Sequence, residues 1–383
     1  MSHNLARLES ALGPSEIHYA VKCNPHPSVL AAVHSAGGGF EVASVAELRT
    51  LERLGLSASE VLYSNPVRSP AHIREAWEMG LWRFSFDSLS ELDKLADIAP
   101  GASVYVRLAT DGASCPLNGK FGVGPKEALD LMLAAVKRGL VPYGCTFHVG
   151  SQTTDARAWE SPLDECAWLM TALEDQAGVR LAMVNVGGGF PADYDEPGIP
   201  ALEAIGSSIR RKVAALPYPV RLVAEPGRVL VADAAVLATS VIGRREHRGA
   251  TWIHLDAGAY NGMMEGGGFL GRLRHAVASR PRGLFEPVEP CTLTGPTCDD
   301  ADTLQSDTLL PAELEPGDRV YFATAGAYSA SLATTFNGFD PPRTHMREPA
   351  NGFTASVPRL ANRSTISVGL AVAFALLASG LLP

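Results

Sequence analysis

Short apolar runs alternate with longer amphipathic stretches over the first 225 residues of the chain. Runs of this kind are typical of strands that are buried on both faces, as in a parallel sheet. The predicted strands are Ile17–Val21, Phe40–Ala43, Val61–Ser64, Arg83–Phe86, Val104–Leu108, Tyr143–Phe147, Met183–Val186 and Arg221–Ala224.

The stretches between these runs predict helices. They cover Ser28–Ala36, Val45–Leu54, a stretch starting near Pro70, Leu89–Ile98, Pro125–Arg138, Arg157–Gln176 and Ala201–Leu216. Ser44 is placed to cap the second helix, and Pro70 suits a first helical position. Strands and helices that alternate in this number and order are typical of a (β/α)8 TIM-type barrel. A doubly wound open sheet is the structural alternative.

The pattern changes after the barrel. The later apolar runs Val236–Ile242, Trp252–Asp256, Cys291–Thr294 and Arg319–Phe322 are separated by glycine, proline and charged turns, with weak helical periodicity. They predict a second, mostly β domain. We therefore expect a barrel over residues 10–235, a C-terminal β domain over 236–345 and a tail of uncertain structure over 346–383.

The tail contains an uncharged apolar stretch, Ser364–Pro383. It meets the length of roughly 18 to 20 residues that a membrane span needs. Glycine and serine interrupt the stretch, however, and Arg363 is the only basic residue close to it. A membrane anchor is therefore not our expectation, and a frameshifted or disordered tail is the alternative.

Composition narrows the class of protein. Hydrophobic residues make up 46% of the 383 residues, which excludes a disordered chain. A formal net charge of −9 argues against a nucleic-acid partner. No apolar segment of the kind found in secretory signals follows Met1, so we expect a cytoplasmic protein. The cysteines form no C-x-x-C pair, so we expect reduced thiols and no metal site. The cysteines are Cys23, Cys115, Cys145, Cys166, Cys291 and Cys298.

Unusual residues follow the predicted strands at their carboxyl ends, where the active sites of such barrels lie. They are Lys22, Arg107, His148, Gly187–Gly189, Glu225 and Arg228. Each alone is ordinary: a solvated lysine, an edge histidine, a glycine turn. Their convergence on one rim predicts a site, because glycine backbones and an arginine bind phosphate and a lysine forms an imine with a carbonyl. With a carboxylate for a pyridine nitrogen and an imidazole to cover a ring, these are the parts that pyridoxal phosphate requires.

The chain resembles the fold-type III, alanine racemase-like family of pyridoxal phosphate-dependent decarboxylases, and most closely its ornithine decarboxylase branch. The resemblance runs from about Ile17 to Phe339. The motifs that carry it are YAVKCN (19–24), VRLATD (106–111), FHVGSQ (147–152), GGGFP (187–191), AEPGR (224–228), GPTCDD (295–300) and GAYSASLATTFNGF (326–339). Several motifs in the family's order are far more specific than one glycine-rich loop.

The resemblance implies a role for each matching residue. Lys22 corresponds to the lysine that binds the cofactor covalently, Glu225 to the acid at the pyridine nitrogen and His148 to the histidine stacked on the ring. Arg107 corresponds to an arginine near the ring, and Glu41 stands where many relatives carry aspartate. The phosphate cradle corresponds to Ser151, Gly188, Gly189, Arg228 and Tyr328.

The β domain supplies further residues by the same resemblance. Cys298 corresponds to a cysteine that assists protonation of the carbanion left by decarboxylation, and Asp299 to an acid that contacts the distal amine of the substrate. Asp256 corresponds more loosely to a second such acid, since the match there shifts by one residue. In relatives the Cys298 loop comes from the second subunit, so the resemblance implies a homodimer with shared active sites.

The implied reaction is decarboxylation of a basic amino acid, with L-ornithine to putrescine favoured. An acidic residue after Cys298 suits a cationic distal amine, whereas diaminopimelate decarboxylases typically carry Glu followed by Ser-Gly there. Lysine or diaminopimelate decarboxylation, a racemase on the same barrel, and an inactive cofactor-binding regulator stay open as alternatives. Family members also have a segment before the first helix that includes a β-domain strand, so either the start of this chain is misassigned or its β domain exposes an edge.

Overall fold

The computed structural model describes residues 1–110, 120–194, 198–267, 273–279 and 287–346. Cys115 and the apolar stretch 364–383 lie outside the described residues. The chain divides into two compact units, Met1–Ala192 with Gly198–Leu230 and Asp193–Pro197 with Val231–Pro383. We describe each unit by itself.

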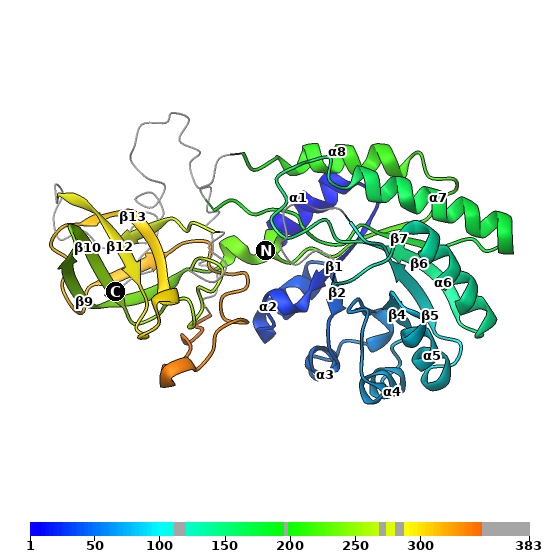
Figure 1. Cartoon of the computed structure of the whole chain (residues 1–383), viewed down its shortest axis with the longest axis horizontal. Coiled ribbons are helices and arrows are strands. Elements are labelled where there is room, and N and C mark those ends of the chain that lie inside the picture. The colour runs from blue at the N-terminus through cyan, green and yellow to red at the C-terminus, as the bar shows by residue number, and fades with distance from the viewer. Residues whose placement is uncertain (111–119, 195–197, 268–272, 280–286, 347–383) are drawn as a thin grey trace. The chain divides into compact units, whose positions relative to one another are not determined.

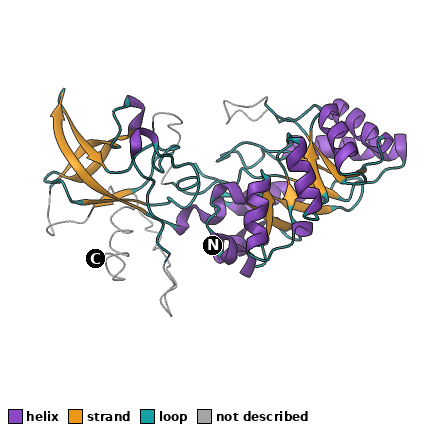
Figure 2. Ribbon diagram, turned by 90° about the horizontal axis from the view of Figure 1, so that it is seen from below, coloured by secondary structure: helices purple, strands orange, loops and turns teal. Residues whose placement is uncertain are grey.

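The first unit is a closed barrel of eight parallel strands in sequential order, with helices on its outside (Figures 1 and 2). β1 closes it by pairing with both β2 and β8. This confirms the predicted TIM-type barrel and excludes the open doubly wound sheet. The strands are β1 (Glu16–Ala20), β2 (Gly39–Val42), β3 (Leu62–Tyr63), β4 (Arg83–Phe86), β5 (Ser103–Arg107), β6 (Val141–Thr146), β7 (Met183–Asn185) and β8 (Arg221–Ala224).

Serine side chains cap three of the barrel helices, and Ser44 does so as predicted. Ser44, Ser69 and Ser88 each accept a hydrogen bond from a backbone N–H in the first turn of α3, α4 and α5, as N-cap serines do. The helices of this unit are α1 (Ser2–Leu12), α2 (Pro27–Ser35), α3 (Val45–Arg53), α4 (Pro70–Glu78), α5 (Leu89–Ile98), α6 (Pro125–Lys137), α7 (Glu160–Ala177), α8 (Leu202–Val213) and the short α9 (Arg228–Val231), with the 3₁₀ turns η1 (Val21–Cys23) and η2 (Ala58–Glu60).

The interior of the barrel is apolar below its polar rim. Leu62, Tyr105, Met183 and Val223 form a cluster that is almost wholly excluded from solvent. These side chains come from β3, β5, β7 and β8 and fill the barrel as a layer, as inward-pointing residues do in this fold. The carboxyl ends of the strands above this layer carry the polar residues of the site.

The second unit is built on a six-stranded sheet in the order β11-β14-β9-β10-β12-β13. β10 and β12 are parallel, and the other neighbours are antiparallel. Its apolar core includes Val241, Ile253, Leu293 and Phe322. The strands are β9 (Leu237–His247), β10 (Ala250–Leu255), β11 (Val277–Ser279), β12 (Val288–Thr294), β13 (Thr303–Pro311) and β14 (Arg319–Phe322), with the 3₁₀ turns η3 (Ala232–Ala234), η4 (Asp300–Asp302) and η5 (Phe336–Gly338).

Two of these strands fall outside the predicted runs. β11 has three residues, which is too short to give a pattern. β13 is rich in polar residues, and Asp307 within it has a positive φ of 54°, so its alternation of buried and exposed positions breaks. Both strands are defined by their partners in the sheet rather than by their own apolar residues.

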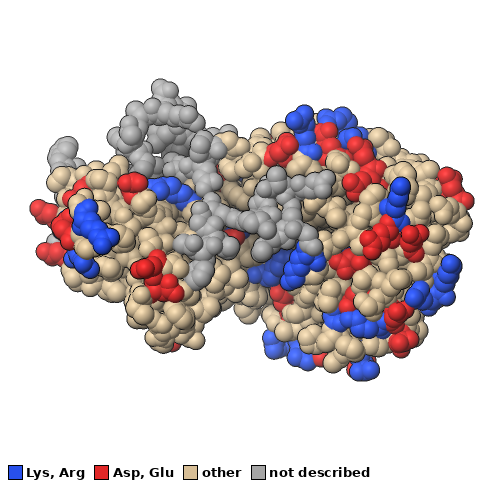
Figure 3. Space-filling model, in the orientation of Figure 1, with Lys and Arg blue, Asp and Glu red and all other residues tan. Residues whose placement is uncertain are grey.

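On the visible face of the barrel unit, charged side chains of both signs are mixed (Figure 3). On the face shown in Figure 3, Lys and Arg side chains alternate with Asp and Glu side chains over the barrel unit. No helix within the described ranges is both long and apolar enough to cross a membrane.

Candidate active site

Lys22 lies in the 3₁₀ turn η1, directly after β1. Its Nζ atom lies 3.9 Å from Oε2 of Glu41 on β2, and half of the Lys22 side chain (52%) stays open to solvent, against 2% for Glu41. The Glu41 carboxylate raises the pKa of Lys22, and burial opposes this shift. Burial raises the pKa of Glu41 to about 8, while the charge of Lys22 opposes that rise. Lys22 and Glu41 thus influence each other's protonation, and the Lys22 side chain stays accessible to solvent.

Glu225 follows β8 and is held by two neutral donors. The Ser64 hydroxyl donates to its Oε1 atom, and the Asn185 amide Nδ2 donates to the same oxygen at 2.6 Å. No donor among the described residues contacts the other oxygen, Oε2. Glu225 therefore presents one carboxylate oxygen that is available to a ligand.

Arg107 and His148 lie at the ends of neighbouring strands. Arg107 is the last residue of β5, and its guanidinium carbon lies 5.3 Å from the centre of the Phe121 ring. Burial and the positive charges of Arg107 and Lys22 lower the pKa of His148 to about 3. The imidazole is therefore neutral near pH 7, so it offers a flat uncharged face beside the site.

The glycine triplet after β7 brings backbone close to this face. A Cβ atom on Gly188 would lie 2.7 Å from the Glu225 carbonyl oxygen and 3.4 Å from His148 Cε1. Gly189 has φ +98°, and a Cβ there would lie 2.5 Å from the Gly150 carbonyl oxygen. Only glycine fits these positions. Within the described residues, the backbone N–H groups of Gly188 and Gly189 have no acceptor, so they are available to an anion.

The loop after β6 and the start of α9 supply polar side chains near these glycines. Arg228 is buried (4% exposed) and donates from Nη2 to the Ser151 hydroxyl at 3.2 Å. Gln152 exchanges two hydrogen bonds with the backbone of Ala192, at 2.6 and 3.0 Å, and so joins the loop after β6 to the loop after β7. The FHVGSQ motif contains Gln152 but gives no signal of this role, because the partner of Gln152 lies 40 residues away.

The chemistry of this donor set fits pyridoxal phosphate. Open glycine N–H groups, a hydroxyl and a buried guanidinium suit a phosphate. A carboxylate oxygen suits the basic ring nitrogen, a neutral imidazole suits the face of the ring, and a solvent-accessible lysine suits the aldehyde. The barrel thus brings together nine of the predicted residues: Lys22, Glu41, Arg107, His148, Ser151, Gly188, Gly189, Glu225 and Arg228.

The second unit contains the other four. Cys298 is exposed, and its Sγ atom accepts a hydrogen bond from Asn337 Nδ2 at 3.2 Å. Asp299 accepts from the Ala301 backbone N–H at 2.9 Å and from the Tyr260 hydroxyl at 2.7 Å. These two bonds lower the pKa of Asp299, the backbone bond most. The Asp299 carboxylate is therefore fixed in its ionised form on the surface of this unit.

Asp256 and Tyr328 are placed differently. Asp256 is exposed at the end of β10, and its Oδ1 atom accepts from the Ser240 backbone N–H at 2.8 Å. One of its oxygens is thus engaged in joining β9 to β10. Tyr328 is half-buried and has a positive φ of 54°, which a residue other than glycine adopts rarely. The roles of both residues stay predictions.

Sequence reasoning missed Asp302, which organises the loop of Cys298 and Asp299. Its carboxylate is fully buried and accepts from the backbone N–H groups of Ala259 at 2.7 Å and Thr297 at 2.9 Å. A Cβ on Gly258 or Gly295 would lie 2.1 or 2.3 Å from Asp302 Oδ1, so both glycines make room for it. An aspartate three residues after Asp299 gives no signal of this, because its partners come from two separate loops.

Comparison with known proteins points the same way as the geometry. Residues 1–232 match the family model described as "Pyridoxal-dependent decarboxylase, pyridoxal binding domain". This range contains all nine of the predicted residues that the barrel brings together.

Curated relatives extend the match beyond the barrel. A lysine/ornithine decarboxylase of Selenomonas ruminantium is 37% identical, over 84% of this chain and 81% of the relative. Ornithine decarboxylase 2 of Drosophila melanogaster is 34% identical, over 86% and 84%. Antizyme inhibitor 2 of Xenopus laevis is 30% identical, over 91% and 79%.

Solved structures share the fold. The SrLDC structure in complex with PLP and cadaverine superimposes with a TM-score of 0.81 at 34% identity, over 88% of this chain and 86% of that chain. A lysine/ornithine decarboxylase from Vibrio vulnificus complexed with cadaverine gives a TM-score of 0.81 at 31% identity, over 88% and 90%.

Proposed function

Because the chain belongs to the family of pyridoxal-dependent decarboxylases, we propose that it removes the α-carboxyl group of a basic amino acid. L-ornithine, giving putrescine, is the preferred substrate, and lysine is the second. The observation that carries this proposal is the set of groups that meet at the barrel rim. They are a solvent-accessible lysine, a carboxylate with hydrogen bonds to one oxygen only, a neutral imidazole and a glycine loop with available N–H groups. Pyridoxal phosphate is the cofactor, as the family match and the PLP-bound neighbour agree.

Each group at the rim has one task in holding the cofactor. Lys22 would hold the cofactor by its aldehyde, and Gly188, Gly189, Ser151 and Arg228 would hold its phosphate, with Tyr328 as a further contact. When bound, pyridoxal phosphate would supply the conjugated ring that accepts the electron pair left by the departing carboxyl group. Glu225 would keep a proton on the ring nitrogen, and the neutral His148 ring would cover the flat face.

The substrate end of the site comes from the second unit. Asp299 is ionised and fixed by two hydrogen bonds, so it suits the distal ammonium of ornithine or lysine. The Cys298 thiol donates a proton from Sγ to the α-carbon after CO₂ leaves. Asp256 is the second candidate partner for the distal amine.

The shared-site dimer is proposed on the family resemblance. Lys22 lies in one unit and Cys298 in the other, and the family resemblance places the Cys298 loop in the site of the opposite subunit. We propose a two-fold dimer with two shared sites, because an isologous interface supplies each site with both sets.

A regulator without turnover is the second candidate, and the 30% identity to an antizyme inhibitor is the observation that favours it. Loss of turnover removes the need for an intact catalytic set. This chain retains Lys22, His148, Glu225 and Cys298, so we place it with the enzymes.

Release of CO₂ by the purified protein with pyridoxal phosphate tests the proposal. Ornithine, lysine, arginine and diaminopimelate are compared at equal concentration, and the amine products are identified by chromatography. We expect ornithine to be consumed fastest and Lys22→Ala to be inactive. Faster turnover of diaminopimelate would overturn the substrate class, and no turnover of any of them by cofactor-loaded protein would favour the regulator.

A further inference from the structure

The carboxylate of Glu225 is held at one oxygen only. Ser64 follows β3, and Asn185 is the last residue of β7. Both donate to Oε1, the amide at 2.6 Å. Both donors are neutral and buried, with Ser64 8% and Asn185 0% exposed. They therefore hold the carboxylate in place without cancelling its charge.

The direction of the hydrogen bonds around Ser64 follows from proton counting. A serine hydroxyl has one proton, and Ser64 donates it to Glu225 because an ionised carboxylate only accepts. The contact of 2.8 Å between the Ser64 and Tyr105 hydroxyl oxygens then needs Tyr105 as its donor. The result is an ordered chain from Tyr105 through Ser64 to Glu225, in which each bond strengthens the next.

Tyr105 combines an apolar ring, which packs in the barrel interior, with a hydroxyl that contacts Ser64. Its ring belongs to the apolar layer of the barrel with Leu62 and Met183 and is fully buried. Burial and the charge of Glu225 raise the pKa of Tyr105 well above its usual range. The phenol therefore keeps its proton and stays a donor.

The amide of Asn185 has one possible orientation. Its Oδ1 atom accepts from the Gly187 backbone N–H at 2.9 Å. Nδ2 must then face Glu225, which joins the glycine loop to the carboxylate through one side chain. An isosteric carboxylate at this position would have no proton to donate while ionised, so the contact depends on the amide.

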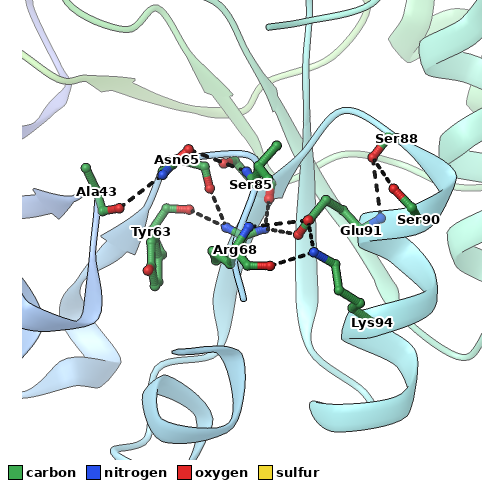
Figure 4. A network of polar contacts seen from close by, with 10 residues as sticks. Ala43, Tyr63, Asn65, Arg68, Ser85, Ser88, Ser90, Glu91 and Lys94 are labelled. Carbon is green, nitrogen blue, oxygen red and sulfur yellow. Dashed lines mark hydrogen bonds and ion pairs between the residues drawn. The ribbon is translucent and has the colours of Figure 1, made fainter. Parts of the chain in front are cut away.

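Arg68 fixes the backbone on both sides of Ser64. Figure 4 shows Arg68 donating from Nη1 to the carbonyl oxygens of Tyr63 and Asn65, at 3.3 and 2.7 Å. Arg68 Nη2 also lies 3.6 Å from the carboxylate of Glu91, and both side chains are almost fully buried. A buried ion pair in this position holds Ser64 within a rigid segment, so its hydroxyl has little freedom to leave Glu225.

We propose that Ser64, Tyr105 and Asn185 are positioning residues that hold the Glu225 carboxylate at Oε1 and leave Oε2 for the ring nitrogen of the cofactor. This inference rests on the proposed function, in which Glu225 is the partner of that nitrogen. A cationic partner would also hold the carboxylate, but its positive charge would oppose protonation of the ring, and neutral donors avoid this.

The test uses the cofactor-loaded enzyme. We expect Ser64→Ala and Asn185→Ala each to lower kcat about tenfold, as the loss of one bond to a charged group does, with KM changed less than about twofold. The visible absorbance of the bound cofactor should shift, because protonation of its ring changes. Tyr105→Phe acts through Ser64 and should lower kcat less, about threefold.

Two further variants separate a positioning role from a structural one. Ser85→Ala removes a buried hydroxyl on β4 that has no hydrogen-bond partner among the residues described, and it should leave kcat and absorbance unchanged. In the Glu225→Gln background, Ser64→Ala should cost nothing more, because both changes act at the same carboxylate.

The outcomes separate a failure of the positioning role from a failure of the proposed function. If Glu225→Gln is slow while Ser64→Ala and Asn185→Ala turn over like the wild type, the positioning role is wrong and the proposed function stands. The role is also wrong if the losses in the Ser64 and Glu225 variants simply multiply. A Glu225→Gln enzyme with wild-type kcat and absorbance would overturn the role of Glu225 itself.

Discussion

The Nζ atom of Lys22 lies 3.9 Å from Oε2 of Glu41, a carboxylate that is almost completely removed from water. A lysine ammonium must lose a proton before its nitrogen can bond to an aldehyde. With its pKa raised to about 8 by burial, Glu41 is itself mostly protonated near neutral pH. Only its charged form raises the pKa of Lys22, so a protonated Glu41 lets the Lys22 ammonium release its proton more readily. The extra methylene of glutamate, where many family members carry aspartate, extends this carboxylate toward the amine.

The first prediction concerns Lys22 itself. The wild-type protein with pyridoxal phosphate should show a visible absorbance band that borohydride bleaches, and mass spectrometry should then place the cofactor on the peptide of Lys22. Lys22→Ala should lose both signals because no amine is left at this position. Lys120→Ala, an exposed lysine of the same unit, is the matched control. A reducible adduct in Lys22→Ala would show that another lysine binds the cofactor.

The second prediction is a pH dependence of folding stability that Glu41 causes. Its pKa is about 8 in the folded chain, against an ordinary value of 4.5. Between these values the folded chain holds more protons than the unfolded chain, so the free energy of unfolding should fall as pH rises through this window and then level off. The full shift corresponds to about 3 to 5 kcal/mol.

Urea unfolding of the cofactor-free protein from pH 5 to pH 8.5 measures this effect. Glu41→Gln cannot ionise, so the wild type should lose stability relative to this variant as pH rises. Parallel curves for the two proteins would mean that Glu41 titrates at its ordinary pKa.

The barrel could be predicted from the sequence because short apolar runs alternate with amphipathic stretches in the number and order of its strands and helices. The rim residues could be found for a related reason: Lys22, His148 and Glu225 interrupt the pattern at the ends of strands. Their neighbours could not be found this way. In the sequence, Tyr105 looks like any other apolar residue of a strand. Its proposed role depends on the Ser64 hydroxyl, which lies 41 residues away.

The second unit shows the same limit. Cys298 and Asp299 were found through a motif, whereas Asp302 acts through backbone groups of two loops that the sequence does not connect. Long-range hydrogen bonds of this kind have no periodicity, so only the folded chain reveals them.

The third prediction concerns Asp302. Asp302→Ala leaves the buried N–H group of Ala259 and the partly buried N–H group of Thr297 without their acceptor. We expect a loss of about 2 to 4 kcal/mol in the free energy of unfolding, measured by urea denaturation, together with a higher KM for the amino acid. Asp300→Ala, two residues away and exposed, is the control and should change neither. An Asp302→Ala protein as stable as the control would contradict the role in organising this loop.

The fourth prediction concerns the distal end of the substrate. If Asp299 pairs with the distal ammonium, Asp299→Ala should raise KM for ornithine and lysine by about tenfold or more, because an ionic partner is lost. Asp299→Asn, which keeps the shape but not the charge, should behave like Asp299→Ala. Steady-state kinetics with both substrates measures this, with Asp256→Asn assayed beside it. Unchanged KM values in both Asp299 variants would remove this residue from the substrate site.

The last prediction tests the shared site. Lys22→Ala and Cys298→Ala chains should each be inactive or strongly impaired, yet a mixture of the two should recover activity. In a mixed dimer with shared sites, one site carries both substitutions and the other carries neither. Random exchange makes about half of the dimers mixed, and half of their sites are intact, so activity should approach roughly a quarter of the wild type. Differently tagged chains and a pull-down establish that exchange has occurred. Mixed dimers that stay as inactive as their parents would show that Lys22 and Cys298 of the same chain serve one site.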